Sequence, residues 1–312
     1  RTELSLGRPS VRPGSKLFAV GTDNPDIEHH FLMLLDSEVI QNKRQDPIIS
    51  ALRLSDHVRD THWISKEYIL CAVGRNVSIV KVGREDAALK LKNTIPICHD
   101  LIREIAPRPN NAVECASGGF DKKLRVSNLV KSITLHEQAM SDTIGSVKWH
   151  DCSNGVLACT LDYGGLQVFD SRIGLSKPSF KMNTGKPELY THCSIGEHLM
   201  LLGYGDGCMQ LIDQRVEKKI LLRTEDPFVD GIGDIVFNPV SNSIVVSGLS
   251  DFTVWKLDSS TNVATAWSHS EISKNKFANK DGYSISACFL DNDSVLACDR
   301  QGYAGVYRQG FG

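Results

Sequence analysis

Short runs in which apolar and polar residues alternate recur along the chain at a spacing of about 43 residues. Residues 166–172 read LQVFDSR, residues 209–215 read MQLIDQR, and residues 252–258 read FTVWKLD. Similar runs occur earlier, at residues 77–82 (VSIVKV) and 124–128 (LRVSN). Alternation with a period of two places successive side chains on opposite faces of an extended chain, so each run predicts a β-strand.

Each of these strands has companions at fixed positions around it. An apolar segment that ends in a turn rich in glycine and aspartate precedes each run, as in residues 199–207 (LMLLGYGDG), and this arrangement predicts a hairpin. A further strand lies upstream and ends in a polar turn such as WHDCSN or FNPVSN, and a weaker strand follows the run. Four short strands in about 43 residues are typical of one blade of a β-propeller.

The repeat extends over the whole chain and predicts a single all-β domain, residues 1–312, with seven four-stranded antiparallel blades. The third strands of these blades are centred on Leu35, Val80, Ser127, Phe169, Ile212, Trp255 and Tyr307. The first blade is the least regular, because residues 41–55 resemble a long charged connection. The last blade shows only three strands, while residues 2–6 (TELSL) form an orphan strand. We therefore predict that the N-terminal strand completes the last blade and removes an open sheet edge.

The repeat resembles that of the WD40 family in three features: the D-x-R that follows a third strand, Trp255 within a third strand, and the Gly/Asp turns at residues 119–121 and 205–207. The glycine-histidine dipeptide of that family is missing throughout. The resemblance implies a seven-bladed WD40-like propeller. Residues 57–63 (HVRDTHW) and the pair His99-Asp100 further resemble the methylosome WD-repeat subunit, which partners a protein arginine methyltransferase.

Composition and charge narrow the class of protein. The 312 residues are 41% hydrophobic and 23% charged, as expected for a chain that buries a core. The net charge is −2, which does not favour a nucleic acid or an anionic membrane as partner. No apolar run approaches the length of a membrane span, and the first twenty residues lack a signal-like pattern. Nine cysteines without a C-x-x-C pair favour reduced thiols, so we expect a cytoplasmic or nuclear protein.

The polar residues give no pattern of a catalytic or metal site. The histidines lack the spacing of metal ligands, and phosphate-binding loops, nucleophile elbows and H-E-x-x-H are absent. Four aspartates recur at equivalent turns, where we expect them to accept backbone N–H groups: Asp121, Asp162, Asp206 and Asp251. We therefore predict a protein that is not an enzyme, with no catalytic residues, no metal site and no cofactor.

The turns between second and third strands carry bulky aromatic and basic residues. They hold Arg75, Phe120, Lys122, Lys123, Tyr163, Tyr204, Phe252 and Arg300. In WD40-like propellers these turns emerge on one face near the central channel, so the residues form our predicted partner-binding surface. The alternative is that some of the rings cover neighbouring blades.

These observations predict a non-catalytic scaffold or adaptor that binds protein partners within a multiprotein complex. Binding of RNA or of a nucleoprotein is one alternative, because basic and aromatic residues also stack on bases. A second alternative is the substrate-presenting partner of a protein arginine methyltransferase, which follows from the resemblance. A third is a calcium-dependent or hydrolase-type propeller enzyme. No membrane partner is expected.

Overall fold

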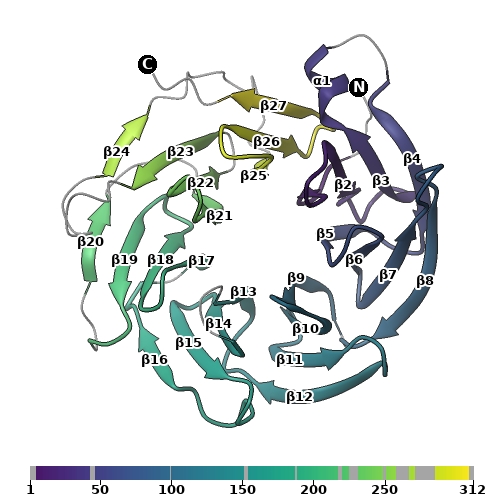
Figure 1. Ribbon diagram of the computed structural model, residues 1–312. Coiled ribbons are helices and arrows are strands. Elements are labelled where there is room, and N and C mark those ends of the chain that lie inside the picture. Colours follow the sequence, from purple (N-terminus) through teal and green to yellow (C-terminus); the bar gives the residue numbers. More distant parts are fainter. Residues whose placement is uncertain are drawn as a thin grey trace.

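Seven antiparallel sheets stand around a central axis in this computed structural model (Figure 1). The structure describes residues 5–42, 46–98, 100–150, 154–186, 188–216, 220–224, 231–248, 251–257, 267–270 and 285–308. Within these residues six sheets have four strands and the last has three. The prediction of an all-β, seven-bladed propeller is therefore confirmed.

The strands follow one another along the chain from the axis to the rim. Blades 1 and 2 comprise β1 (Ser10–Val11), β2 (Leu17–Gly21), β3 (His30–Asp36), β4 (Ile48–Leu54), β5 (Val58–Trp63), β6 (Tyr68–Val73), β7 (Asn76–Val82) and β8 (Leu89–Pro96). Blades 3 and 4 comprise β9 (Ile102–Arg108), β10 (Asn111–Gly119), β11 (Lys123–Asn128), β12 (Ile133–Ala139), β13 (Ile144–Trp149), β14 (Val156–Leu161), β15 (Gly165–Asp170) and β16 (Phe180–Asn183).

The remaining blades repeat the same order. Blades 5 and 6 comprise β17 (Leu189–Ile195), β18 (Leu199–Tyr204), β19 (Met209–Asp213), β20 (Ile220–Thr224), β21 (Ile232–Asn238), β22 (Ser243–Gly248), β23 (Phe252–Leu257) and β24 (Trp267–Ser270). Blade 7 comprises β25 (Ile285–Phe289), β26 (Ser294–Asp299) and β27 (Ala304–Arg308). All seven residues expected at the centres of third strands lie in β3, β7, β11, β15, β19, β23 and β27.

Blade 1 differs from the expectation that residues 41–55 form a long charged connection. The segment 41–55 contains β4, which pairs with β3 at the rim and is therefore more than a charged connection. Along β4 exposed and half-buried side chains alternate, because only one face of this outermost strand packs on the sheet. Its apolar pattern is consequently weak. Between β3 and β4 lies the short helix α1 (Ser37–Asn42). No helix in the described part of the chain is long and apolar enough to cross a membrane.

The core consists of the interfaces between neighbouring blades. Each cluster of buried apolar side chains among the described residues draws on two adjacent blades, and together these clusters follow the ring. Between blades 3 and 4, for example, Leu124 and Val126 of one sheet are grouped with Val147 and Leu157 of the next. Because the apolar surface lies between sheets, each blade depends on both neighbours for its burial.

The ring closes between blades 7 and 1. Leu6 is buried there, and its N–H donates to the carbonyl of Asp299 in blade 7 at 3.1 Å. Ser5 accepts from the N–H of Asp23 in the turn after β2 at 2.8 Å. Residues 1–4 lie outside the described residues, so pairing of the N-terminal strand with β27 stays a prediction.

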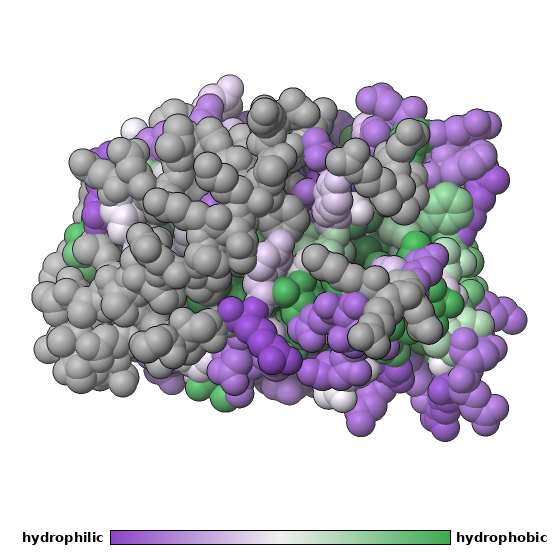
Figure 2. All heavy atoms as spheres, turned by 90° about the horizontal axis from the view of Figure 1, so that it is seen from above, coloured by the Kyte–Doolittle hydropathy of each residue, from purple (hydrophilic) through white to green (hydrophobic). Residues whose placement is uncertain are grey.

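Among the described residues, the third strand of blade 7 contacts a helix and pairs with no fourth strand. Helix α1 contacts β27, and Ile40 packs in the cluster that joins blades 7 and 1. Ala304, Val306 and Tyr307 of β27 are nevertheless half-buried, whereas β15 and β19 are almost fully buried in their blades. Figure 2, which views the rim from this side, shows apolar side chains at the surface beside hydrophilic ones.

The turn aspartates are largely as expected. Three accept the N–H of a nearby residue: Lys123 donates to Asp121, Cys208 to Asp206, and Phe252 to Asp251, at 3.2, 3.2 and 2.7 Å. Asp162 differs, because its carboxylate binds the side chain of Arg103. The eight cysteines in the described residues form no disulfide with one another, and Cys152 lies outside those residues.

Candidate functional site

The propeller has two faces, which we name by their connections. The turn face carries the connections between second and third strands and between blades. The loop face carries the connections between first and second and between third and fourth strands. Because strands alternate in direction within each blade, every innermost strand begins at the turn face and ends at the loop face. A residue's position along such a strand therefore gives its depth in the central channel.

The eight predicted binding residues all lie at or next to the turn face, with different exposure. Arg75, Phe120, Lys122, Tyr163 and Arg300 are exposed, and Lys123 is half-buried. Among the predicted aromatic residues, Tyr163 is the most open, with 77% of its surface exposed, and Phe120 follows with 41%. These residues could contact a partner without any rearrangement of the fold.

Tyr204 and Phe252 are not exposed, and their placement at open turn tips was wrong. Tyr204 is fully buried, and its hydroxyl donates to Oε1 of Gln210 at 2.8 Å. Phe252 packs edge-on against Tyr307 of the next blade, with ring centres 5.1 Å apart. Tyr204 is the last residue of β18 and Phe252 the first of β23, so both rings belong to strands and cover the neighbouring blade.

Arg103 of blade 3 contacts residues of blades 3, 4 and 5 at the turn face. Its Nη1 donates to both carboxylate oxygens of Asp162, at 2.7 and 2.8 Å. The guanidinium lies over the ring of Phe120 at 5.4 Å and near that of Tyr190 at 5.8 Å. Three blades thus hold one arginine between two aromatic rings. Arg103 was not among the predicted residues, although the strings VRD and IRE at the starts of β5 and β9 repeat an arginine at one register.

Further arginines surround this mouth of the channel. Arg300 Nη2 lies 3.4 Å from Oδ2 of Asp23. Burial lowers the pKa of Arg59 below its ordinary value, and the neighbouring Arg103, Arg8 and Arg300 lower it further, against the opposing effect of Asp23. Because arginine side chains remain protonated in proteins, the mouth carries several positive charges at close range.

Deeper in the channel the innermost strands present a ring of polar side chains. The third residue of five successive strands is Asp60, Glu104, Ser146, Thr191 and Asp234. Two of these carboxylates reach the next blade: Asp60 accepts the N–H of Ile105 at 3.0 Å, and Glu104 accepts that of Val147 at 2.8 Å. A recurring register in the sequence, an aliphatic residue followed two positions later by a polar one, marks this ring and could have revealed it.

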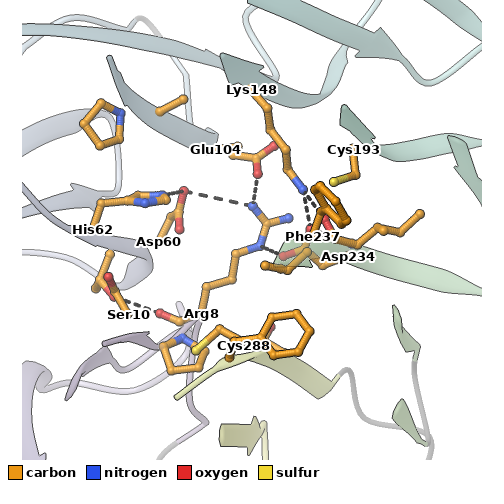
Figure 3. A pocket seen from close by; sticks show the side chains of 18 of the residues that line it. Arg8, Ser10, Asp60, His62, Glu104, Lys148, Cys193, Asp234, Phe237 and Cys288 are labelled. Atoms are coloured by element: carbon orange, nitrogen blue, oxygen red, sulfur yellow. Dashed lines mark hydrogen bonds and ion pairs between the residues drawn. The ribbon is translucent and has the colours of Figure 1, made fainter. Parts of the chain in front are cut away.

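Arg8 enters this ring from the N-terminal segment (Figure 3). Its Nη1 donates to Glu104 at 2.5 Å and lies 4.0 Å from Asp60, and its Nε lies 3.6 Å from Asp234. Opposite Arg8, Lys148 Nζ lies 2.7 Å from Asp234. We call Arg8, Asp60, His62, Glu104, Lys148 and Asp234 the charged floor.

The pKa directions of the charged floor describe a tightly paired network. Burial lowers the pKa of Arg8 and Lys148, but the surrounding carboxylates outweigh burial, and both pKa values are raised. Burial raises the pKa of Asp234, but Lys148 and Arg8 outweigh it and hold that pKa below its ordinary value. His62 lies 3.2 Å from Asp60, which raises the histidine pKa against the effect of burial. Arg8, Lys148 and Asp234 are therefore ionised at neutral pH.

Next to the charged floor the channel contains a cavity of about 480 Å³. Its walls include Pro107, Trp149, Phe237 and Phe289, which lie near the ends of their innermost strands. The cavity therefore belongs to the loop-face half of the channel, with charge at its inner end and apolar side chains along its walls.

Neither the site nor the comparisons identify a chemistry for this protein. Within the part of the chain that the structure describes, no group of three or more His, Cys, Asp or Glu side chains is arranged to hold a metal ion. No known protein-family model matches the chain, and no curated protein matches it either.

Proposed function

We propose that this protein is a WD-repeat-type scaffold that binds protein partners through its turn face over blades 3, 4 and 5. The observation that carries the proposal is the exposure of Tyr163 and Phe120 beside the immobilised guanidinium of Arg103. Aromatic and arginine side chains supply most of the binding energy at protein interfaces. A side chain that is already held in place loses little entropy when a partner binds.

The resemblance to WD40 repeats supports the same proposal. Asp170 and Asp213 each end a third strand and bind an arginine two residues later, with Nη2 to Oδ2 distances of 2.6 Å at Arg172 and Arg215. This pairing gives the repeated D-x-R a structural role at the loop face. A propeller fold alone does not determine function, so the proposal rests on the surface residues. The narrower proposal, a partner of a protein arginine methyltransferase, rests only on the short strings at residues 57–63 and 99–100.

A double variant, Phe120→Ala with Tyr163→Ala, tests the proposed surface. Partners are first captured from native extract with the parent protein, identified by mass spectrometry and purified. Loss of two aromatic anchors should weaken binding about thirtyfold or more. Ile173→Ala is the matched control, because Ile173 is 78% exposed but lies on the loop face. Equal affinity of the parent and the double variant for every purified partner would remove this surface from consideration.

Nucleic-acid binding is the second candidate, and the arginines of the channel mouth favour it. Arg103 lies beside two aromatic rings that could stack on unpaired bases, and both Arg103 and Arg300 lie near enough to Arg59 to lower its pKa. Titration of a labelled single-stranded RNA at several salt concentrations tests it, because contacts to phosphates give an affinity that falls steeply with salt. Lys122→Glu with Lys123→Glu should then weaken RNA binding and reduce its salt dependence. Binding of protein partners that survives nuclease treatment, together with no RNA affinity, would exclude this candidate.

A further inference from the structure

The cavity on the loop-face side of the channel has chemical properties that a protein-binding turn face does not explain. It is lined by residues of the innermost strands of blades 1 to 7, so the whole ring contributes to it. With about 480 Å³ it is large enough for a small organic group. Its inner end is formed by the charged floor, whose side chains converge in Figure 3.

The charged floor has more carboxylates than cations. Arg8 and Lys148 are its two permanent cations, whereas Asp60, Glu104 and Asp234 are three carboxylates. Lys148 Nζ already has three partners: Asp234 at 2.7 Å, the carbonyl of Ile235 at 2.9 Å and Thr191 at 3.4 Å. The cavity therefore offers a surplus of negative charge when His62 is neutral, and its lysine has no donor left for an anion.

Two buried polar atoms of the cavity lining also lack partners among the described residues. Within that part of the chain, Oδ1 of Asp60 has no hydrogen-bond partner, although the Asp60 side chain is only 1% exposed. Oγ of Ser194, another lining residue, has none there either. A buried carboxylate oxygen without a donor is costly, and a ligand N–H group would remove that cost.

The walls of the cavity favour a ligand that has an apolar stem. Phe237 and Phe289 are half-buried, so part of each ring remains available for contact. Trp149 is fixed by its indole N–H, which donates to the carbonyl of Ala106 at 2.8 Å. Aromatic faces attract organic cations and also cover the alkyl chains that carry them.

We propose that this cavity binds an alkylammonium or alkylguanidinium group, with its cation at Asp60 and its apolar stem against the aromatic walls. The group could belong to a free amine or to a lysine or arginine side chain of a peptide, and a peptide ligand separates these sources. An inorganic anion is disfavoured by the surplus carboxylate. A metal ion is disfavoured because the described carboxylates do not form a metal-binding cluster.

Calorimetric titration of the intact parent protein with matched four-carbon ligands tests the proposal directly. The series consists of n-butylammonium, n-butylguanidinium, n-butanol and n-butyrate, at about pH 8 and again at about pH 9, because higher pH favours the neutral form of His62, whose pKa is raised above its ordinary value. The two cations should bind at least tenfold more tightly than the neutral alcohol, and butyrate should not bind measurably. Equal affinity for the alcohol and the cations would overturn the proposal, as would no binding of either cation.

Variants locate the binding within the cavity. Asp60→Asn retains an oxygen for the N–H of Ile105 but removes the charge. It should weaken the binding of both cations at least tenfold. Glu85→Gln is the control, because it removes an exposed carboxylate in the connection between β7 and β8, outside the lining of the cavity. If Asp60→Asn fails to fold, Phe237→Ala provides a second variant. It should weaken the binding of n-butylguanidinium several-fold. Unchanged affinity in the folded variant would contradict this location.

A blocked tripeptide with arginine at its centre distinguishes the two sources of the ligand. Tighter binding of this peptide than of n-butylguanidinium indicates that backbone contacts at the loop face add to the interaction, and hence a peptide side chain. Tighter binding of the free cation indicates a small amine or guanidine. Failure of the whole ligand series would leave the turn-face function unaffected, because its test uses different residues and a different face.

Discussion

The two ends of the central channel are built from the same strands but have opposite properties. At the turn face Arg59 and Arg103 gather positive charge among exposed aromatic rings. One residue deeper, Asp60 and Glu104 belong to a buried network with a surplus of carboxylates. Adjacent residues on one strand thus lie in different environments, one near solvent and one in the buried network. Depth along the channel decides whether a charge lies near solvent or within a buried network.

This difference has an energetic consequence. Charges near solvent are screened, and replacing one of them changes stability little. Charges within the floor have lost their hydration, so removing one partner leaves another buried and uncompensated. We therefore expect substitutions in the floor to act on folding and substitutions at the turn face to act on binding.

Arg8→Ala should have the largest effect on stability. It leaves Glu104 and Asp234 without one of their cations, and breaking a buried pair in this way costs about 3–5 kcal/mol. Urea unfolding of the variant measures the loss. Arg75→Ala, which removes an exposed arginine at the turn face, is the control and should change the free energy of unfolding by no more than about 0.5 kcal/mol. Equal stability of the two variants would contradict the contrast between the two ends.

Tyr204→Ala and Tyr163→Ala compare a buried ring at the end of a strand with an exposed ring in a turn. Removing the fully buried Tyr204 ring should cost about 3–5 kcal/mol, because it leaves a cavity between blades. Tyr163→Ala should cost about 0.5 kcal/mol or less. Thermal unfolding of both variants checks the order. Similar midpoints would mean that Tyr204 is not a packing residue.

Removal of residues 1–7 should lower the unfolding midpoint by several degrees. It deletes Leu6 from the cluster between blades 7 and 1, and burial of one leucine is worth about 2–5 kcal/mol. A shorter deletion of residues 1–4 sharpens the result. An equal fall in both variants would support closure of the last blade by the first residues, whereas a fall only in the longer one would assign the effect to Ser5–Gly7.

Acidification should destabilise the protein through His192. The expected loss in the free energy of unfolding per pH unit is smaller than the losses expected for the destabilising variants above. His192 of β17 is fully buried, and neither ring nitrogen has a hydrogen-bond partner among the described residues. Burial, followed by Lys148 and His150, lowers its pKa well below the ordinary value. The unfolded chain therefore binds a proton that the folded state excludes, and the free energy of unfolding falls as pH drops through about 6.5.

The slope from one such histidine is at most about 1.4 kcal/mol per pH unit. His192→Gln should reduce the slope, as measured by urea unfolding between about pH 7.5 and 5.5. His62 acts in the opposite direction. Its raised pKa adds stability at low pH, which is lost as pH rises through the folded-state pKa. An unchanged slope in His192→Gln would show that His192 is protonated in the folded protein.

The repeated strands could be predicted without a structure because every blade has the same order of short strands and turns. Third strands such as β15 and β19 are buried on both faces between neighbouring sheets, so their apolar pattern is strong, and all seven third strands were placed correctly. The outermost strands have one exposed face, and β4 was consequently mistaken for a connection. The two-residue β1 offers too short a pattern to detect.

The sequence by itself determined the number of blades, the order of strands and the face on which the turn residues lie, because periodicity and turn chemistry are local properties. Only the tertiary structure decided that Tyr204 and Phe252 cover neighbouring blades while Tyr163 remains exposed. It also brought Arg8, Asp60, Glu104 and Asp234 together from positions far apart in the chain. Burial and charge pairing arise from distances between blades, and closure of the ring sets those distances.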